Sequence, residues 1–73
     1  MQTIKAKIYK PDLILLNNSK ELNQVYDLIT KDEDFIITWT EKGITYSEVI
    51  ISTHLNGKLK NNEIKLQSLE ETK

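Results

Sequence analysis

Between residues 35 and 53, β-branched and aromatic residues fill two short segments that flank a single glycine, Gly43. Strands favour these residue types, and glycine readily adopts the positive φ that a tight turn needs. The pattern therefore predicts a β-hairpin. Large apolar side chains fall on both of its faces, so one core cannot accommodate all of them. The second face requires another cover, which can be a helix, a second copy of the chain or a partner.

The length of the hairpin loop decides which side chains share a face. A two-residue loop at Lys42-Gly43 needs positive φ at Lys42, which a residue with a Cβ atom resists. We therefore favour a three-residue loop over residues 41–43, in which Thr40 faces Ile44. The predicted core face then carries Phe35, Ile37, Trp39, Val49 and Ile51. The predicted second face carries Ile36, Ile44, Tyr46 and Ile50, with Thr38, Thr40 and Glu48 between them.

The N-terminal segment, residues 2–9, alternates between apolar and polar positions, as a half-buried strand does. One face carries Ile4, Ala6 and Ile8, and the other carries Lys5, Lys7 and Tyr9. Pro11 ends this strand, because proline lacks the amide hydrogen that a ladder needs. The four apolar residues 13–16 fit either a short buried strand or a tight crossover, and we favour the strand.

Residues 19–30 show the spacing of an amphipathic helix. Asn18 is a suitable N-cap, and Glu21 follows it three residues later, as in a capping box. The apolar stripe follows the i, i+3, i+4, i+7 pattern and consists of Leu22, Val25, Tyr26 and Ile29. The pattern predicts one helix of about three turns.

Asn56-Gly57 is the dipeptide most typical of a tight hairpin turn in this chain. It predicts that the strand ending near His54 returns as a last strand through Leu59, Ile64 and Leu66. The predicted order is strand, strand, helix, strand, strand, strand. We therefore expect an α+β fold, with one helix packed on an antiparallel-dominated sheet of four to five strands, for which a β-grasp-like order is one topology. Residues 1–69 form this single domain, and residues 70–73 form a frayed polar tail.

Composition limits the classes of function. The 73 residues include no cysteine and no arginine, and ten lysines balance eleven acidic residues to a net charge of −1. The absence of arginine disfavours bidentate recognition of phosphate or guanine. The longest apolar run, residues 13–16, is too short to cross a bilayer, so we expect a cytoplasmic protein without membrane contact. Abundant Lys, Asn and Ile, which AT-rich codons encode, indicate a low-GC bacterium, or a phage or mobile element within one.

Recognisable catalytic motifs are absent from the sequence. His54 is the single histidine, and no carboxylate has a ligand-like spacing to it. The acidic run 32–34 fails as an EF-hand loop, because Ile37 occupies the sixth position, where that loop needs glycine. Gly43 and Gly57 lie too far apart for a phosphate-binding loop. We expect no enzymatic activity, no cofactor and no metal.

The remaining hypothesis is a small protein-binding module, such as a regulator or inhibitor, that binds another protein or forms a homodimer. The predicted partner-binding residues are Ile36, Thr38, Tyr46, Glu48 and Ile50. An alternative is a single-stranded nucleic-acid-binding module, in which lysines attract the backbone and an aromatic ring stacks on a base. The residues for that alternative are Lys5, Lys7 and Tyr9 on one face and Lys58, Lys60 and Lys65 on the last strand.

Overall fold

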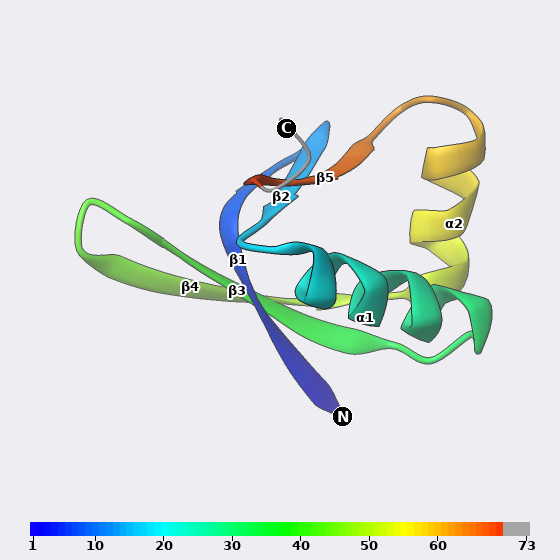
Figure 1. Ribbon diagram of the computed structural model, residues 1–73, viewed down its shortest axis with the longest axis horizontal. Helices are drawn as coiled ribbons and strands as arrows, with labels where there is room; N and C mark the ends of the chain where they lie inside the picture. The colour runs from blue at the N-terminus through cyan, green and yellow to red at the C-terminus, as the bar shows by residue number, and fades with distance from the viewer. Residues whose placement is uncertain (70–73) are drawn as a thin grey trace.

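The computed structural model describes residues 1–69 as five strands and two helices (Figure 1). The strands are β1 (Gln2–Lys10), β2 (Leu13–Leu16), β3 (Phe35–Glu41), β4 (Ile44–Ile50) and β5 (Lys65–Ser68). The helices are α1 (Ser19–Thr30) and α2 (Ser52–Lys60). The predicted α+β class is confirmed, and the predicted strand at 13–16 and helix at 19–30 are present. The predicted tail, residues 70–73, lies outside the described residues.

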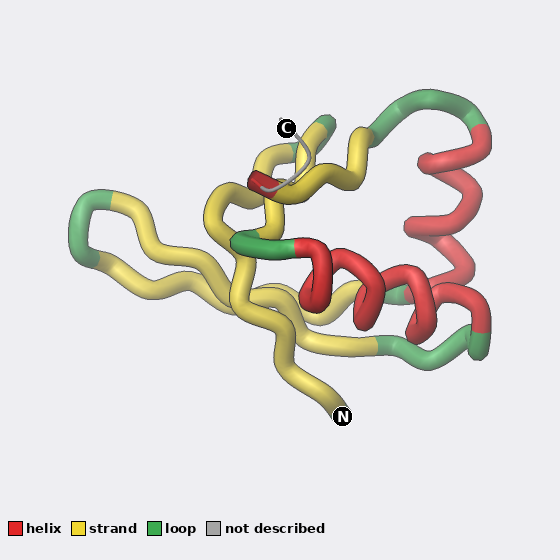
Figure 2. Tube along the Cα trace, in the orientation of Figure 1, coloured by secondary structure: helices red, strands yellow, loops and turns green. Residues whose placement is uncertain are grey.

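The five strands form one mixed sheet in the order β4-β3-β1-β2-β5 (Figure 2). β1 and β3 each form an antiparallel pair with the strand that follows, β2 and β4. Two parallel pairings, β1 with β3 and β2 with β5, join the remaining neighbours. The expectation of an antiparallel-dominated sheet is therefore only roughly met. A hairpin, a helix and a second hairpin follow one another along the chain, and α2 and β5 come after them.

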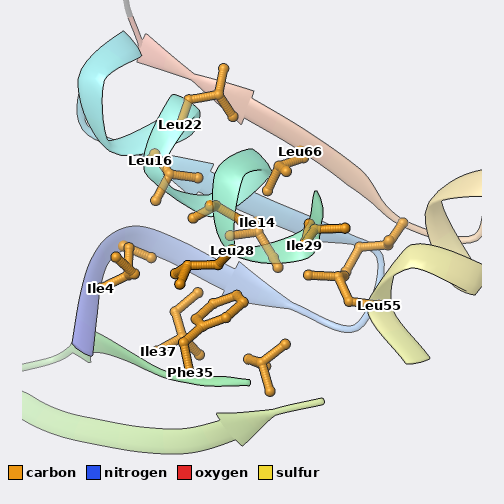
Figure 3. Packing of buried hydrophobic residues seen from close by; sticks show 14 residues of the cluster. Ile4, Ile14, Leu16, Leu22, Leu28, Ile29, Phe35, Ile37, Leu55 and Leu66 are labelled. Carbon is orange, nitrogen blue, oxygen red and sulfur yellow. The ribbon is translucent and has the colours of Figure 1, made fainter. Parts of the chain in front are cut away.

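Both helices contribute to a single core on one side of the sheet, which we call the helix face; the opposite side is the outer face. Figure 3 shows Leu28 of α1 beside Phe35 and Ile37 of β3, and Ile29 of the same helix near Leu55 of α2. The fully buried side chains include Phe35, Ile37, Ile14, Leu16 and Val25. No helix within residues 1–69 has the length and apolar character needed to cross a membrane.

The N-terminal end of α1 is set by local hydrogen bonds. The Asn18 side chain accepts a hydrogen bond from the Glu21 amide at 2.9 Å, as the predicted N-cap requires. Glu21 in turn accepts from the amide of Asn17 at 3.2 Å, one residue before the position that a capping box would use. The Asn17 side chain also donates to the carbonyl of Lys5, which connects the start of the helix to β1.

The second helix corrects the expectation of a strand and an Asn56-Gly57 turn. Residues 52–60 are helical, and Leu55 is buried in the core. The start of α2 is held by the loop between α1 and β3, because the Ser52 amide donates to the Asp34 carboxylate at 2.9 Å and the Ser52 hydroxyl donates to the Glu33 carbonyl. Burial of Leu55 and packing of Leu59 against the core outweigh the poor helix propensity of glycine, which costs about 1 kcal/mol. The final strand pairs with β2 and not with β4.

The hairpin closes through the two-residue loop, which corrects the favoured three-residue register. Glu41 faces Ile44, and both Lys42 (φ 52°) and Gly43 (φ 80°) have positive φ, as in a type I′ turn. Shifting the register by one residue moves side chains to the opposite face. Ile50 therefore joins Phe35 and Ile37 in the core, whereas the predicted core residues Val49 and Ile51 are about half exposed, at 52% and 46%.

A β-bulge in β1 corrects the predicted alternation of that strand. Ala6 pairs with Leu16 and Ile8 with Leu15, so Lys7 is the extra residue. Beyond the bulge, Tyr9 lies opposite buried Ile14 and therefore points to the helix face. Ile8 moves to the outer face.

Two adjacent isoleucines test these facings. We expect Ile37→Ala, in the core, to lower the free energy of unfolding by about 2–5 kcal/mol. Its matched control is Ile36→Ala, which removes the same atoms from a half-buried position on the outer face and should cost clearly less. Chemical denaturation measures both. Equal losses at the two positions would contradict the assigned core face.

Substitution at Lys42 tests the turn. A non-glycine residue at positive φ costs about 1–2 kcal/mol, and asparagine tolerates this conformation better than most residues. We expect Lys42→Asn to raise the melting temperature and Lys42→Val, which is β-branched, to lower it. If neither variant differs from the parent, Lys42 does not have positive φ and the two-residue loop is wrong.

Candidate functional site

Three aromatic rings line the helix face in the half of the β3–β4 hairpin that is nearer its turn. Trp39 and Tyr46 are cross-strand partners, and their rings stack with centroids 5.6 Å apart and planes inclined by 23°. Tyr9, which the bulge turns to this face, contacts the other side of Trp39 at 4.7 Å with an inclination of 51°. Such offset and tilted pairs are the arrangements that aromatic quadrupoles favour. The result is a continuous aromatic cluster from β1 to the edge strand β4.

Two carboxylates bind the polar atoms of this aromatic cluster. The Tyr9 hydroxyl donates to Glu48 Oε2 at 2.8 Å, and the Trp39 indole Nε1 donates to Glu41 Oε1 at 3.0 Å. Burial, and then the hydrogen bond and negative charge of Glu48, raise the pKa of the Tyr9 phenol from 10.0 to about 12. Tyr9 and Trp39 are thus fixed by hydrogen bonds as well as by stacking, and Tyr46 is fixed by stacking, which lowers the conformational entropy that binding would cost.

A pocket of about 150 Å³ opens beside Glu48, between β4 and α2. Ile14 and Leu55 belong to its apolar lining, and its polar lining consists of Tyr9, Glu48, His54 and Lys58. The volume is smaller than the roughly 300–1,000 Å³ of typical small-molecule sites. A pocket of this size suits one side chain of a partner, with an apolar floor and a rim that carries both signs of charge.

The edge strand β4 exposes an unusual amount of apolar surface. Seven large apolar side chains are exposed within residues 1–69, and four of them lie between residues 44 and 51. These four are Ile44 (56% exposed), Tyr46 (41%), Val49 (52%) and Ile51. We call β3, β4 and their turn the hairpin arm. Figure 1 shows the turn of this arm extending well beyond the helices.

The structure does not bring the five predicted partner-binding residues onto one face. Ile36 and Thr38 lie on the outer face, whereas Tyr46, Glu48 and Ile50 lie on the helix face, with Ile50 buried in the core. The one-residue difference in register causes this division. Sequence reasoning placed Tyr9 on the lysine face of its strand and Trp39 in the core, and did not bring the two rings together, because the bulge at Lys7 that turns Tyr9 toward Trp39 has no clear signal in the sequence.

The lysine sets of the nucleic-acid alternative are also rearranged. Lys5 lies on the outer face, where it pairs with Thr38, but Tyr9 points to the helix face. Lys58 and Lys60 belong to α2 and Lys65 to β5, so they do not follow one strand as predicted.

Elsewhere in the described residues, the structure has a second hollow, whose lining is less apolar than that of the first pocket. This hollow of about 430 Å³, beside the β1–β2 turn, is lined mainly by polar and charged groups of both signs, including Lys10, Asp12, Glu63 and Lys65. Within residues 1–69, no three His, Cys, Asp or Glu side chains are grouped closely enough to hold a metal ion.

The chain was compared with protein-family models, curated proteins and solved structures, and none of them matched it.

The raised pKa of Tyr9 gives a prediction for stability at high pH. Because the phenol ionises near pH 10 in the unfolded chain and near pH 12 in the folded protein, its contribution is complete below pH 10 and is lost between pH 10 and 12. The matched control is Tyr9→Phe, which removes only the ionisable hydroxyl and keeps the ring. We expect the difference in unfolding free energy between the parent and Tyr9→Phe to shrink across this window. A constant difference would contradict the role of the Tyr9 hydroxyl.

Proposed function

We propose that this protein is a small protein-binding module that contacts its partner through the hairpin arm. The observation that carries the proposal is the concentration of exposed apolar side chains on β4 and the residue that follows it. Isolated exposed apolar residues are common on soluble proteins, whereas contiguous apolar surface is typical of an interaction site. Here Ile44 and Tyr46 lie on the helix face and Val49 on the outer face, so the exposed apolar atoms lie on both sides of the free edge of β4.

The composition of the arm supports contact with a protein. Tyrosine and tryptophan are frequent at energetically important interface positions, and Trp39 and Tyr46 are held rigidly by stacking. Within β4 the single charged residue is Glu48, which already accepts a hydrogen bond from Tyr9. Binding through the arm therefore depends on apolar contact more than on charge. Tyr46 and Glu48 stay in the proposed surface, and Ile50 leaves it because its side chain belongs to the core.

The absence of a catalytic motif and the small size favour a regulator or inhibitor over an enzyme. The lysine-rich, asparagine-rich composition leads us to propose a cytoplasmic role in a low-GC bacterium, or in a phage or mobile element that such a bacterium carries.

A double threonine variant tests the arm as the binding surface. Ile44→Thr with Val49→Thr removes apolar atoms but keeps β-branched residues, so the hairpin should remain folded. The matched control is Tyr26→Gln, which removes an exposed apolar side chain from α1. In capture experiments from host lysate, we expect the parent and the control to retain the same protein and the double variant to lose most of it.

Salt separates this proposal from nucleic-acid binding. An apolar protein contact should survive an increase in salt concentration, whereas affinity for a phosphate backbone falls steeply. Retention that is unchanged in the double variant, or captured nucleic acid that is released by salt, would contradict the proposal.

A further inference from the structure

The outer edge of β4 lacks most of the features that usually protect an edge strand. Natural edge strands are blunted by charged side chains, especially lysine, and by proline, a bulge or short length, and the one charged residue of β4, Glu48, is engaged by Tyr9. β4 has seven residues, contains neither lysine nor proline, and pairs with β3 over its whole length without a register shift. The strand at the other end of the sheet, β5, has four residues and begins with Lys65. Within residues 1–69, β4 pairs with no strand other than β3.

The backbone groups that β4 offers at this edge follow from the turn. Glu41 and Ile44 flank a two-residue loop, so they form a hydrogen-bonded pair, and such pairs recur at every second residue. Residues 44, 46, 48 and 50 therefore direct their amide and carbonyl groups toward β3. Thr45, Ser47 and Val49 direct theirs outward. These three residues can form a new ladder only with another strand.

The side chains of β4 are arranged almost symmetrically about Ser47. Tyr46 and Glu48 flank it, then come two β-branched residues, Thr45 and Val49, and both ends of the strand are isoleucine. If β4 of a second copy is aligned antiparallel about Ser47, all seven residues of one strand have a cross-strand partner in the other. Each isoleucine would face an isoleucine, each threonine a valine, and each Tyr46 the Glu48 of the other copy. Tyrosine can donate a hydrogen bond to a carboxylate, so this last pair is complementary.

Neighbouring registers are less favourable. The outward backbone groups allow alignments about Tyr46, Ser47 or Glu48, because each of these pairs outward residues with outward residues. Alignment about Glu48 places two carboxylates opposite each other, which is destabilising. Alignment about Tyr46 shortens the overlap and places Ile44 opposite Glu48.

We infer that β4 pairs antiparallel with β4 of a second copy of this chain, centred on Ser47, so that two five-stranded sheets become one continuous sheet. This inference rests on the proposed function, since it names a second copy as the occupant of the edge of the hairpin arm. The two-fold axis passes between the two Ser47 residues, and the helices of both copies lie on the same side of the joined sheet.

Charge variants test the dimer. The parent should sediment with about twice the chain mass of 8.5 kDa. Thr45→Lys with Val49→Lys places lysines opposite each other at two symmetric positions and should weaken dimerisation by on the order of tenfold or more. The corresponding double glutamate variant should also be weakened, and an equimolar mixture of the two should restore the dimer. Asn23→Lys with Gln24→Lys adds the same charge on the exposed side of α1 and should leave the parent dimer intact.

Cysteine variants test the register, because the chain has no other thiol. Directly opposed residues of a hydrogen-bonded pair have Cα atoms about 5.5 Å apart, within the range for a disulfide. Oxidation should therefore cross-link Ser47→Cys into a covalent dimer. Tyr46→Cys would face its counterpart only diagonally, at about 7–8 Å, and should cross-link poorly. Preferential cross-linking of Tyr46→Cys would overturn the Ser47-centred register.

The outcomes separate this inference from the proposed function. A parent chain that remains monomeric at all concentrations, or lysine and glutamate variants whose mixture does not associate, would overturn the homodimer. If a monomeric parent still retains a protein that the double threonine variant loses, the arm is a binding surface for another partner and the proposed function stands. If the dimer forms as described but no other protein is retained, the second copy is the partner.

Discussion

The register between β3 and β4 is the constraint on which the rest of the structure depends. A two-residue turn, in which Lys42 accepts positive φ, places Phe35, Ile37 and Ile50 together beneath the helices. Phe35 and Ile37 face the core in either register, so the local conformational cost at one lysine, about 1–2 kcal/mol, is offset by the burial of Ile50, which is worth about 1.5–3 kcal/mol. The same register stacks Trp39 on Tyr46 and leaves Val49 outside.

The helices cover only part of the helix face, and the aromatic cluster of the candidate site lies where this cover ends. α1 and α2 bury the ends of β3 and β4 that lie near Phe35 and Ile50, whereas the arm continues beyond them toward Gly43. Along the arm, aromatic stacking and hydrogen bonds to Glu41 and Glu48 replace helix packing. A short chain with a thin core thus maintains an ordered apolar extension, a feature that is useful for association and costly to leave in water.

Sequence reasoning succeeded where one local signal agreed with the tertiary structure. The Asn18 cap and the apolar spacing after it placed α1 at its observed bounds. It failed where packing overrode a local preference. Asn56-Gly57 is a strong turn signal, yet buried Leu55 and the hydrogen bonds from Ser52 make this segment helical. The predicted three-residue register was wrong for the same reason. The conformational cost of positive φ at Lys42 is outweighed by the burial of Ile50. The bulge at Lys7 has no clear sequence signal, and without it Tyr9 could not be placed beside Trp39.

Nuclear magnetic resonance of the protein in solution tests the central claim, the β3–β4 register, most directly. In an antiparallel ladder, the α-protons of a non-hydrogen-bonded pair lie close together and give a strong cross-strand nuclear Overhauser effect. The observed pairing predicts such effects between Thr38 and Ser47 and between Ile36 and Val49. Strong effects that instead connect Trp39 with Thr45 would show that the hairpin closes through three residues. The burial of Ile50, the stacked Trp39–Tyr46 pair and the outward backbone groups assigned to β4 would then all be wrong.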